Sequence, residues 1–234
     1  MGLISRKRIK YQLMQYRYRS HACNTSFDWD WRAADYNRIA LVNLLVSLRG
    51  GPDCNYLEIG CASNELFSAV HSNRRTGVDP EAGGTRRETS DQFFAANREK
   101  FDVIFIDGLH EYEQVRRDCV NALACLADGG WIAFHDFLPR NWKEQHVPRL
   151  QAEWTGDCWK MAVELAESDE IDFRIFTIDY GVGVMRPKKA SARLADRQDE
   201  LRNAQYDYFV NVLDKLPRTD WADGVSWLRS HQVK

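Results

Sequence analysis

The sequence predicts an α/β fold in which a doubly wound, mostly parallel sheet carries helices on both faces. Short apolar runs and helical patterns alternate along the chain. The most apolar run, residues 101–107, is typical of an interior strand buried on both faces. The predicted strands end in acids at Glu58, Asp79, Asp107 and Asp136. Because ligands of such sheets bind outside the carboxyl ends of the strands, we expect these carboxylates to converge on one crevice.

The first part of the chain precedes the predicted sheet. Residues 1–20 carry six basic side chains, no acid and several tyrosines. This basic aromatic arm is interpreted either as a clamp for an anionic or sugar-like substrate or a partner chain, or as a solvated or subunit-packing extension. Apolar residues at helical spacing then predict a mostly buried helix over residues 36–48, which Gly50-Gly51-Pro52 ends.

The first half of the sheet is expected to begin at residue 55. A buried strand ends at Glu58, and a helix begins at Glu65 after a tight turn. A second strand over residues 75–79 is closed by a proline and followed by a charged, glycine-containing loop. Ser90 or Asp91 then caps the next helix, which precedes the apolar strand.

The second half continues the alternation of helix and strand. The remaining elements are expected to be a helix over 112–127 ended by Asp128-Gly129-Gly130, a strand over 131–134, a helix through Trp159, a β-hairpin of 172–178 and 182–185, and a charged helical region from 188 onward. Repeated alternation of this kind is typical of a parallel sheet.

Length and composition are those of an ordinary globular protein. The 234 residues fit one domain, and 44% hydrophobic residues with a net charge of −2 give no global case for nucleic acid or membrane binding. No apolar run approaches a membrane span or a signal peptide, so we expect a cytoplasmic protein. The six cysteines are dispersed, which predicts reduced thiols rather than a zinc or redox motif.

The turn after the first strand is unlike a dinucleotide-binding turn. Pyrophosphate fingerprints need several glycines that let backbone amides approach the anion, whereas only Gly60 stands before the non-glycine residues 61–64. Asp79 follows Gly60 by 19 residues, about the separation at which an acid accepts hydrogen bonds from ribose hydroxyls. A cofactor with a ribose but no phosphates therefore fits best.

These residues resemble the class I S-adenosylmethionine-dependent methyltransferases, whose first motif has the form Glu/Asp-x-Gly-x-x-x-Gly. Asn64 replaces the last glycine of that motif. Within that superfamily the sequence resembles methyltransferase family 24. The segments that carry this resemblance are Leu57–Cys61, Gly77–Pro80, Gly83–Thr85, Thr89–Phe94, Phe101–Tyr112 and Gly129–Asp136, with 156–160 and 181–184 beyond them.

The resemblance implies a Rossmann-like, mostly parallel seven-stranded sheet with helical N- and C-terminal extensions. It implies one globular unit in three parts: a basic arm and N-terminal helix over 1–50, an S-adenosylmethionine-binding methyltransferase domain over 51–187, and a C-terminal helical extension over 188–234.

The resemblance also implies a set of cofactor-binding residues. Glu58 and Gly60 would face the methionine end of S-adenosylmethionine, and Asp79 the ribose. Ser90 and Asp91 would contact the adenine, whose exocyclic amine can donate a hydrogen bond to a carboxylate. A role of these two residues as a plain helix cap is equally well supported by the sequence. The neighbours Cys61, Pro80 and Asp107 complete the implied cofactor site.

Methyl transfer needs a positioned nucleophile and a group that removes its proton. A base with a pKa near 7 suits a hydroxyl substrate, and His110, three residues beyond Asp107, is the best placed candidate. His135 is the second choice. Asp107 and Asp136 would orient the substrate, either directly or through a metal.

A divalent ion is the alternative left open at Asp107 and Asp136. These strand ends resemble the positions that hold Mg²⁺ in catechol-type and macrolide-sugar O-methyltransferases, and an ion there could lower the pKa of a substrate hydroxyl. Those enzymes have a further oxygen ligand directly after the second acid, where this chain has Phe137. His110 could complete the shell, although Mg²⁺ prefers oxygen donors.

The predicted activity is O-methylation of a small-molecule hydroxyl, on a sugar or a secondary metabolite. Trp142, Trp154 and Trp159 follow the strand at 131–134 and either wall the acceptor pocket or belong to the core. The open alternatives are N- or S-methylation, or a non-catalytic S-adenosylmethionine-binding protein. A nicotinamide-dependent oxidoreductase is disfavoured, because this sequence lacks the glycines with which such enzymes bind the cofactor's phosphates. We expect no membrane or nucleic-acid partner and leave a homodimer open.

Overall fold

The computed structural model describes residues 6–31 and 33–231, which contain one seven-stranded sheet in the order β2-β1-β3-β4-β6-β5-β7. The strands are β1 Asn55–Ile59, β2 Arg74–Val78, β3 Phe101–Ile106, β4 Leu126–Phe134, β5 Ile171–Phe176, β6 Val182–Pro187 and β7 Arg218–Thr219. β6 is antiparallel to both neighbours, and the other pairs are parallel. The predicted mostly parallel α/β fold is therefore confirmed.

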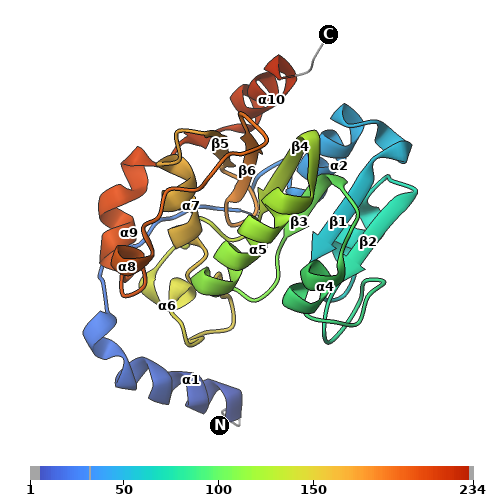
Figure 1. Cartoon of the computed structure of the whole chain (residues 1–234). Coiled ribbons are helices and arrows are strands. Elements are labelled where there is room, and N and C mark those ends of the chain that lie inside the picture. The colour runs from blue at the N-terminus through green and yellow to red at the C-terminus, as the bar shows by residue number, and fades with distance from the viewer. Residues whose placement is uncertain (1–5, 32, 232–234) are drawn as a thin grey trace.

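Helices cover both faces of this sheet, and α5 crosses in front of it in Figure 1. The helices are α1 Arg6–Arg17, α2 Arg38–Leu48, α3 Glu65–Ala69, α4 Ser90–Ala96, α5 Tyr112–Cys125, α6 Trp142–Gln145, α7 Trp159–Ala166, α8 Gln198–Leu201, α9 Tyr206–Val212 and α10 Trp221–Ser230, with short 3₁₀ turns η1 Arg19–His21, η2 Gly51–Asp53 and η3 Leu213–Lys215. None of the helices within the described residues is long and apolar enough to cross a membrane.

Alternating side chains of the strands divide the core into two clusters. On one face Leu57 and Ile104 pack with residues of α5, α7 and α9, and on the other Tyr56 and Phe105 pack with residues of α2, α3 and α10. Successive residues of a strand point to opposite faces, so a strand buried on both sides must be apolar throughout. This explains the apolar run from residue 101.

The element boundaries differ from the predicted ones at α5 and β4. The helix ends at Cys125, and the following strand already begins at Leu126 rather than at residue 131. The pairing with β3 jumps between Leu126 and Trp131, with Gly129 at φ +72°. The glycines expected to end the helix, Gly129 and Gly130, therefore lie in an irregular stretch of β4. Gly129 permits the backbone bend there, because it has no side chain.

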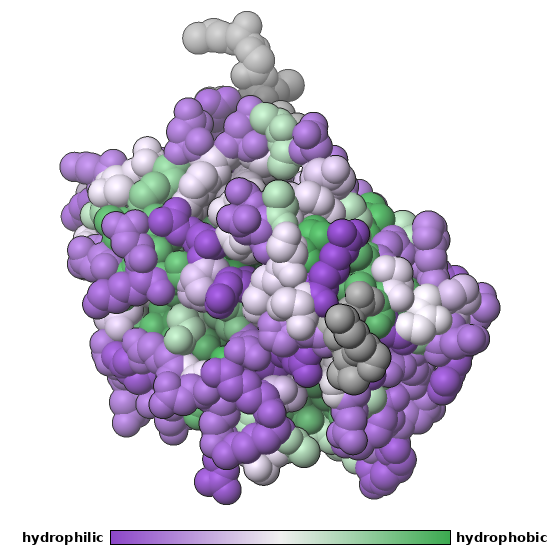
Figure 2. Space-filling model, turned by 90° about the horizontal axis from the view of Figure 1, so that it is seen from above, coloured by the Kyte–Doolittle hydropathy of each residue, from purple (hydrophilic) through white to green (hydrophobic). Residues whose placement is uncertain are grey.

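The terminal regions hold elements that the sequence pattern did not predict. Residues 6–17 form helix α1, which lies apart from the sheet, at the same end of the molecule as α6 (Figure 1). The region after residue 188 is helical as expected, but it also contributes the edge strand β7 beside β5. Figure 2 looks down on the opposite end, where hydrophilic residues dominate and hydrophobic ones show as separate spots.

Candidate active site

The backbone conformation of the turn after β1 explains why its motif has Gly60 and Asn64 at these positions. Gly60 has φ +87°, and a Cβ on it would lie 2.1 Å from the carbonyl oxygen of Asp107. The glycine is therefore required by the neighbouring backbone as well as by any ligand. Asn64 has φ +64°, a conformation that asparagine tolerates almost as glycine does. Its Oδ1 accepts a hydrogen bond of 2.6 Å from the Gly84 amide, which ties the turn to the next loop.

The carboxylate of Asp79 holds the same turn. Oδ2 accepts from the amides of Cys61 and Ala62 at 3.0 and 2.9 Å, and Oδ1 accepts from those of Glu81 and Ala82 at 2.8 Å each. Burial by itself would raise the pKa of Asp79, but these four amide donors lower it. In this structure the carboxylate therefore fixes two loops, and the predicted contact with a ribose stays a prediction.

A first cavity, the Asp79 cavity, has a volume of about 500 Å³. Its lining contains the predicted residues Gly60, Asp79, Pro80, Ser90, Asp91 and Asp107, together with the unpredicted Thr89, Leu109 and Gln114. Thr89, not Ser90 or Asp91, is the N-cap of α4, and Gln92 completes its capping box. The cap prediction for Ser90 and Asp91 is wrong, and both side chains instead accept from Gln114 Nε2, at 3.1 and 3.2 Å.

A second cavity, the Asp136 cavity, has a volume of about 360 Å³ and adjoins the first. The predicted residues in its lining are Glu58, Gly60, Cys61, Asp107, His110, His135 and Asp136, and the others include Arg38, Arg149, Trp154 and Tyr180. Both cavities are lined by Gly60, Ala62, Asp107 and His110. These four residues form a wall that is common to the two cavities.

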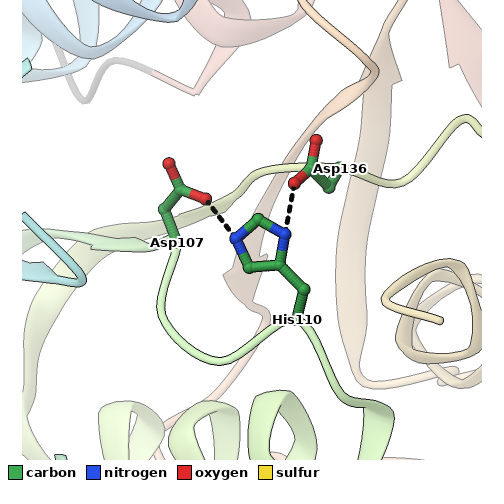
Figure 3. Close-up of side chains that lie close together, drawn as sticks. All are labelled: Asp107, His110 and Asp136. Atoms are coloured by element: carbon green, nitrogen blue, oxygen red, sulfur yellow. Dashed lines mark ion pairs between the residues drawn. The ribbon is translucent and has the colours of Figure 1, made fainter. Parts of the chain in front are cut away.

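Asp107 and His110 of this wall form a cluster with Asp136, which lines the Asp136 cavity only (Figure 3). The His110 ring lies between the two carboxylates, with Nε2 3.4 Å from Asp107 Oδ1 and Nδ1 2.9 Å from Asp136 Oδ2. Asp136 has φ +66°, an uncommon backbone conformation for a residue other than glycine. Such conformations are often kept at functional sites.

His135 stands on the other side of the same two carboxylates. Its Nδ1 lies 3.5 Å from Asp107 Oδ1 and 3.2 Å from Asp136 Oδ1, and its side chain is 10% exposed. The Nε2 atom of His135 lies 3.5 Å from Oδ1 of Asp179. The other carboxylate oxygen of Asp179, Oδ2, accepts a 2.8 Å hydrogen bond from Arg38 Nη1. His135 is therefore surrounded by carboxylates and turned away from free solvent.

The carboxylates and imidazoles stabilise each other's charged forms. Burial by itself would lower the pKa of His110, but Asp136 and Asp107 raise it to about 10. Burial likewise opposes the charged form of His135, but Asp136 and Asp107 raise the pKa of His135 well above its ordinary value. Burial would raise the pKa values of Asp107 and Asp136, but His135 and His110 lower them. The predicted pKa near 7 for His110 is therefore not found here, where the ring is cationic at neutral pH.

Glu58 lies beneath this cluster at the end of β1. Its side chain is buried and accepts a 2.6 Å hydrogen bond from the hydroxyl of Tyr56. Burial raises the pKa of Glu58 to about 7, against the effect of the Tyr56 hydrogen bond. Cys61 lies beside it, with Sγ 3.8 Å from the Glu58 carbonyl oxygen.

Arg38 and Asp179 are site residues that sequence reasoning missed. Arg38 begins α2, and Asp179 lies in the β5–β6 turn, where it was interpreted only as a turn residue. They are 141 residues apart and meet only in the folded chain. Of the three tryptophans after β4, Trp154 lines the Asp136 cavity, while Trp142 and Trp159 belong to the core.

The metal prediction for Asp107 and Asp136 can be tested on this geometry. One donor atom each from Asp107, His110 and Asp136 lies within 4.8 Å of the other two. However, both His110 nitrogens face carboxylates, and Mg²⁺ prefers an octahedron of oxygens at close to 2.1 Å. A set of two carboxylates with an imidazole between them, and Phe137 in place of a further oxygen ligand, fits Mg²⁺ poorly, so no chemical step is assigned to a metal.

Comparison with known proteins finds one matching family model. The model of methyltransferase family 24, described as a methyltransferase domain, matches residues 65–137 and confirms the resemblance found in the sequence. No curated protein matches the chain.

Solved structures are similar only at a distance. An O-methyltransferase from Bacillus cereus in complex with SAH is 16% identical, with 78% of this chain and 91% of that chain covered and a TM-score of 0.45. An SAH-bound Podospora anserina methyltransferase is 14% identical (81% and 99%, TM-score 0.46), and an N-methyltransferase from Bradyrhizobium japonicum is 20% identical (65% and 97%, TM-score 0.38). TM-scores below 0.5 establish neither a shared fold nor a shared acceptor.

Proposed function

Since the chain carries a methyltransferase domain over residues 65–137, we propose that it transfers the methyl group of S-adenosylmethionine to a hydroxyl of a small molecule, such as a sugar or a secondary metabolite. One observation carries the proposal: two cavities of about 500 and 360 Å³ meet at one wall that contains Asp107 and His110. Methyl transfer needs the sulfonium and the acceptor hydroxyl in direct contact, and the region where the two cavities adjoin, beside Asp107 and His110, is where a cofactor and an acceptor could meet.

The two cavities suit different ligands. The Asp79 cavity has the less polar residues Pro80 and Leu109 beside Ser90 and Asp91, which suits an adenine ring whose amine donates to a carboxylate. The methionine part would pass Gly60 and reach Glu58 in the Asp136 cavity. The rest of that cavity is left for the acceptor.

The tautomer of His110 follows from its partners. In the neutral form Asp136 accepts the Nδ1 proton, so that Nε2 carries the lone pair on the side of Asp107. Nε2 would take the proton of the acceptor hydroxyl as its oxygen bonds to the methyl carbon. When bound, S-adenosylmethionine supplies a methyl group on a cationic sulfur that leaves as a neutral thioether. Asp107 and Asp136 stabilise the resulting imidazolium.

The raised pKa of His110 makes cofactor binding part of this mechanism. With a pKa of about 10 the ring is protonated at neutral pH and must lose that proton before it can act as a base. A sulfonium bound beside the ring would lower its pKa, because like charges repel. We therefore expect turnover to increase with pH through the range in which His110 deprotonates.

Calorimetry with S-adenosylhomocysteine and with NAD tests the cofactor assignment. We expect binding of S-adenosylhomocysteine, and its weakening in Ser90→Leu, which would add apolar bulk at the proposed adenine end of the Asp79 cavity. Exchange of Ala127, which lines neither cavity, for serine is the matched control. Binding of NAD in preference to S-adenosylhomocysteine would reject the proposal.

Replacement of the base tests the mechanism separately. With an accepted hydroxyl substrate, His110→Ala should lower turnover by about 10²- to 10⁴-fold, as the loss of a general base does, and change S-adenosylhomocysteine affinity far less. Unchanged turnover would remove His110 from the mechanism while leaving the cofactor assignment intact. Methylation of amines or thiols alone would move the proposal to N- or S-transfer.

A further inference from the structure

The outer wall of the Asp136 cavity is formed by the segment between β4 and α7. Trp154 of this segment stacks on the ring of His110, with centroids 5.3 Å apart and planes inclined by 9°. The carbonyl oxygen of Trp154 also lies 3.3 Å from His110 Nδ1. Trp154 itself is held by its indole Nε1, which donates 2.8 Å to the carbonyl oxygen of His146. The plane of the His110 ring is thus set from both its edge and its face.

The N-terminal segment is bonded to the same wall at three places. Gln15 Nε2 donates 2.9 Å to the Leu150 carbonyl, a nitrogen of His21 meets one of His146 at 3.0 Å, and the Phe27 amide donates 2.8 Å to the Arg140 carbonyl. The described part of helix α1 has no buried residue and lines neither cavity. Residues 15–27 therefore touch the wall of the site without reaching into it.

His146 is the point at which these two sets of contacts meet. It is 1% exposed, and burial lowers its pKa, so the ring is neutral. Its Nδ1 donates 3.0 Å to the Pro148 carbonyl, which leaves Nε2 to accept the proton on His21 Nδ1. The ring of Tyr18 packs 4.6 Å from the same imidazole.

We propose that residues 15–27 brace the wall of the acceptor cavity through His146, and that Trp154 is a positioning residue for His110. The brace runs from His21 to the His146 ring, from the His146 carbonyl to the Trp154 indole, and from the indole face to the His110 ring. The mechanistic meaning of this brace rests on the proposed role of His110 as the base. This role differs from both interpretations of the N-terminal arm, the clamp for a substrate or partner chain and the solvated or subunit-packing extension.

An indole stacked on an imidazole shifts the NMR signals of the imidazole ring protons, which gives a direct readout of the stack. The experiment records ring signals of ¹³C-labelled histidines in the full chain, with His110 assigned from His110→Ala. We expect Trp154→Ala to abolish the shift of the His110 signals and Trp154→Phe, which keeps a ring, to preserve part of it. His21→Ala removes the ring that bonds to His146. In this variant we expect the His110 signals to shift in the same direction as in Trp154→Ala, but by less than the full amount.

Two further variants keep the test decisive. Gln15→Ala removes a milder contact and should give a smaller shift in the same direction, even if His21→Ala does not fold. Leu13→Ala, which changes a side chain 65% exposed on α1, is the matched control and should leave the signals unchanged. Wild-type His110 signals in both His21→Ala and Gln15→Ala would overturn the brace, as would wild-type signals in Trp154→Ala.

The same samples separate this inference from the proposed function. Affinity for S-adenosylhomocysteine is measured on each variant by calorimetry, and we expect it to change little, because none of Gln15, His21, His146 and Trp154 lines the Asp79 cavity proposed for the adenine. Failure of the wild-type chain to bind S-adenosylhomocysteine would reject the proposed function and leave the NMR result readable. With an acceptor in hand, Trp154→Ala should lower kcat more than it raises the KM for S-adenosylmethionine.

Discussion

The two cavities of the site are built in opposite ways. The Asp79 cavity is lined by residues between Ile59 and Gln114, most of them at strand ends or in the loops that follow. The Asp136 cavity draws on residues from Arg38 to Tyr180. The first is therefore a product of local sequence, whereas the second exists only when distant segments of the chain are packed together.

The buried acids of the two cavities are also balanced differently. Four backbone amides hold Asp79, and amides do not titrate. Imidazoles hold Asp107 and Asp136, and they lose their charge when the pH rises. The Asp79 cavity should therefore tolerate alkaline conditions, and the Asp136 cavity should not.

Gly60→Ala should damage both cavities and have the largest effect. A Cβ would lie 2.1 Å from a backbone oxygen of Asp107 at a residue with φ +87°, so the shared wall must move. Strain of this kind costs about 1–3 kcal/mol before the clash is counted. We expect a melting temperature lower by several degrees and no detectable S-adenosylhomocysteine binding. Gly51→Ala, at φ +60° with open space around it, is the control for conformation alone.

Asp79→Asn should damage the first cavity selectively. An asparagine keeps one acceptor oxygen but turns an NH₂ group toward two amide donors, which costs on the order of 1–3 kcal/mol for each buried group left without a partner. S-adenosylhomocysteine affinity should fall strongly, while the His110 NMR signals stay in place. Glu81→Gln, which changes a side chain that lines the same cavity but keeps the backbone amide bonded to Asp79, should bind nearly normally. Equal losses in both variants would contradict the structural role of Asp79.

The sequence predicted the strand-end residues of both cavities and missed the residues that distant packing brings to the second. Gly60, Asp79 and Asp107 directly follow strand ends, and strand ends follow from short-range apolar patterns. Nothing in a local pattern links Arg38 to Asp179, or Trp154 to His110, because these contacts depend on how distant elements pack. Asp107 and Asp136 were expected beside His110, because they end strands of the same sheet, but no local pattern shows how closely the two carboxylates approach the ring, and that distance sets the pKa of His110.

Alkaline pH should weaken the second cavity more than the first. The folded-state pKa of His110, about 10, lies above its unfolded value near 6.5. Its contribution to stability is therefore complete below pH 6.5 and disappears as the pH rises through about 10. The melting temperature of wild type should fall more between pH 7 and pH 10 than that of His110→Gln. Parallel curves for the two proteins would show that the carboxylates do not hold His110 in its charged form.

Mg²⁺ should have the smallest effect of all, and this sharpens the chemical contrast between the cavities. For the ion to bind Asp107 and Asp136, it would have to displace the rings of His110 and His135, whose nitrogens lie 2.9–3.5 Å from these carboxylates. Magnesium gains little from the nitrogen donors that would remain. We expect equal melting temperatures after dialysis against EDTA and in excess Mg²⁺. A stabilisation by Mg²⁺ that Asp136→Asn abolishes would mean that the imidazoles move aside, and the acceptor oxygen would then be activated by a metal instead of by His110.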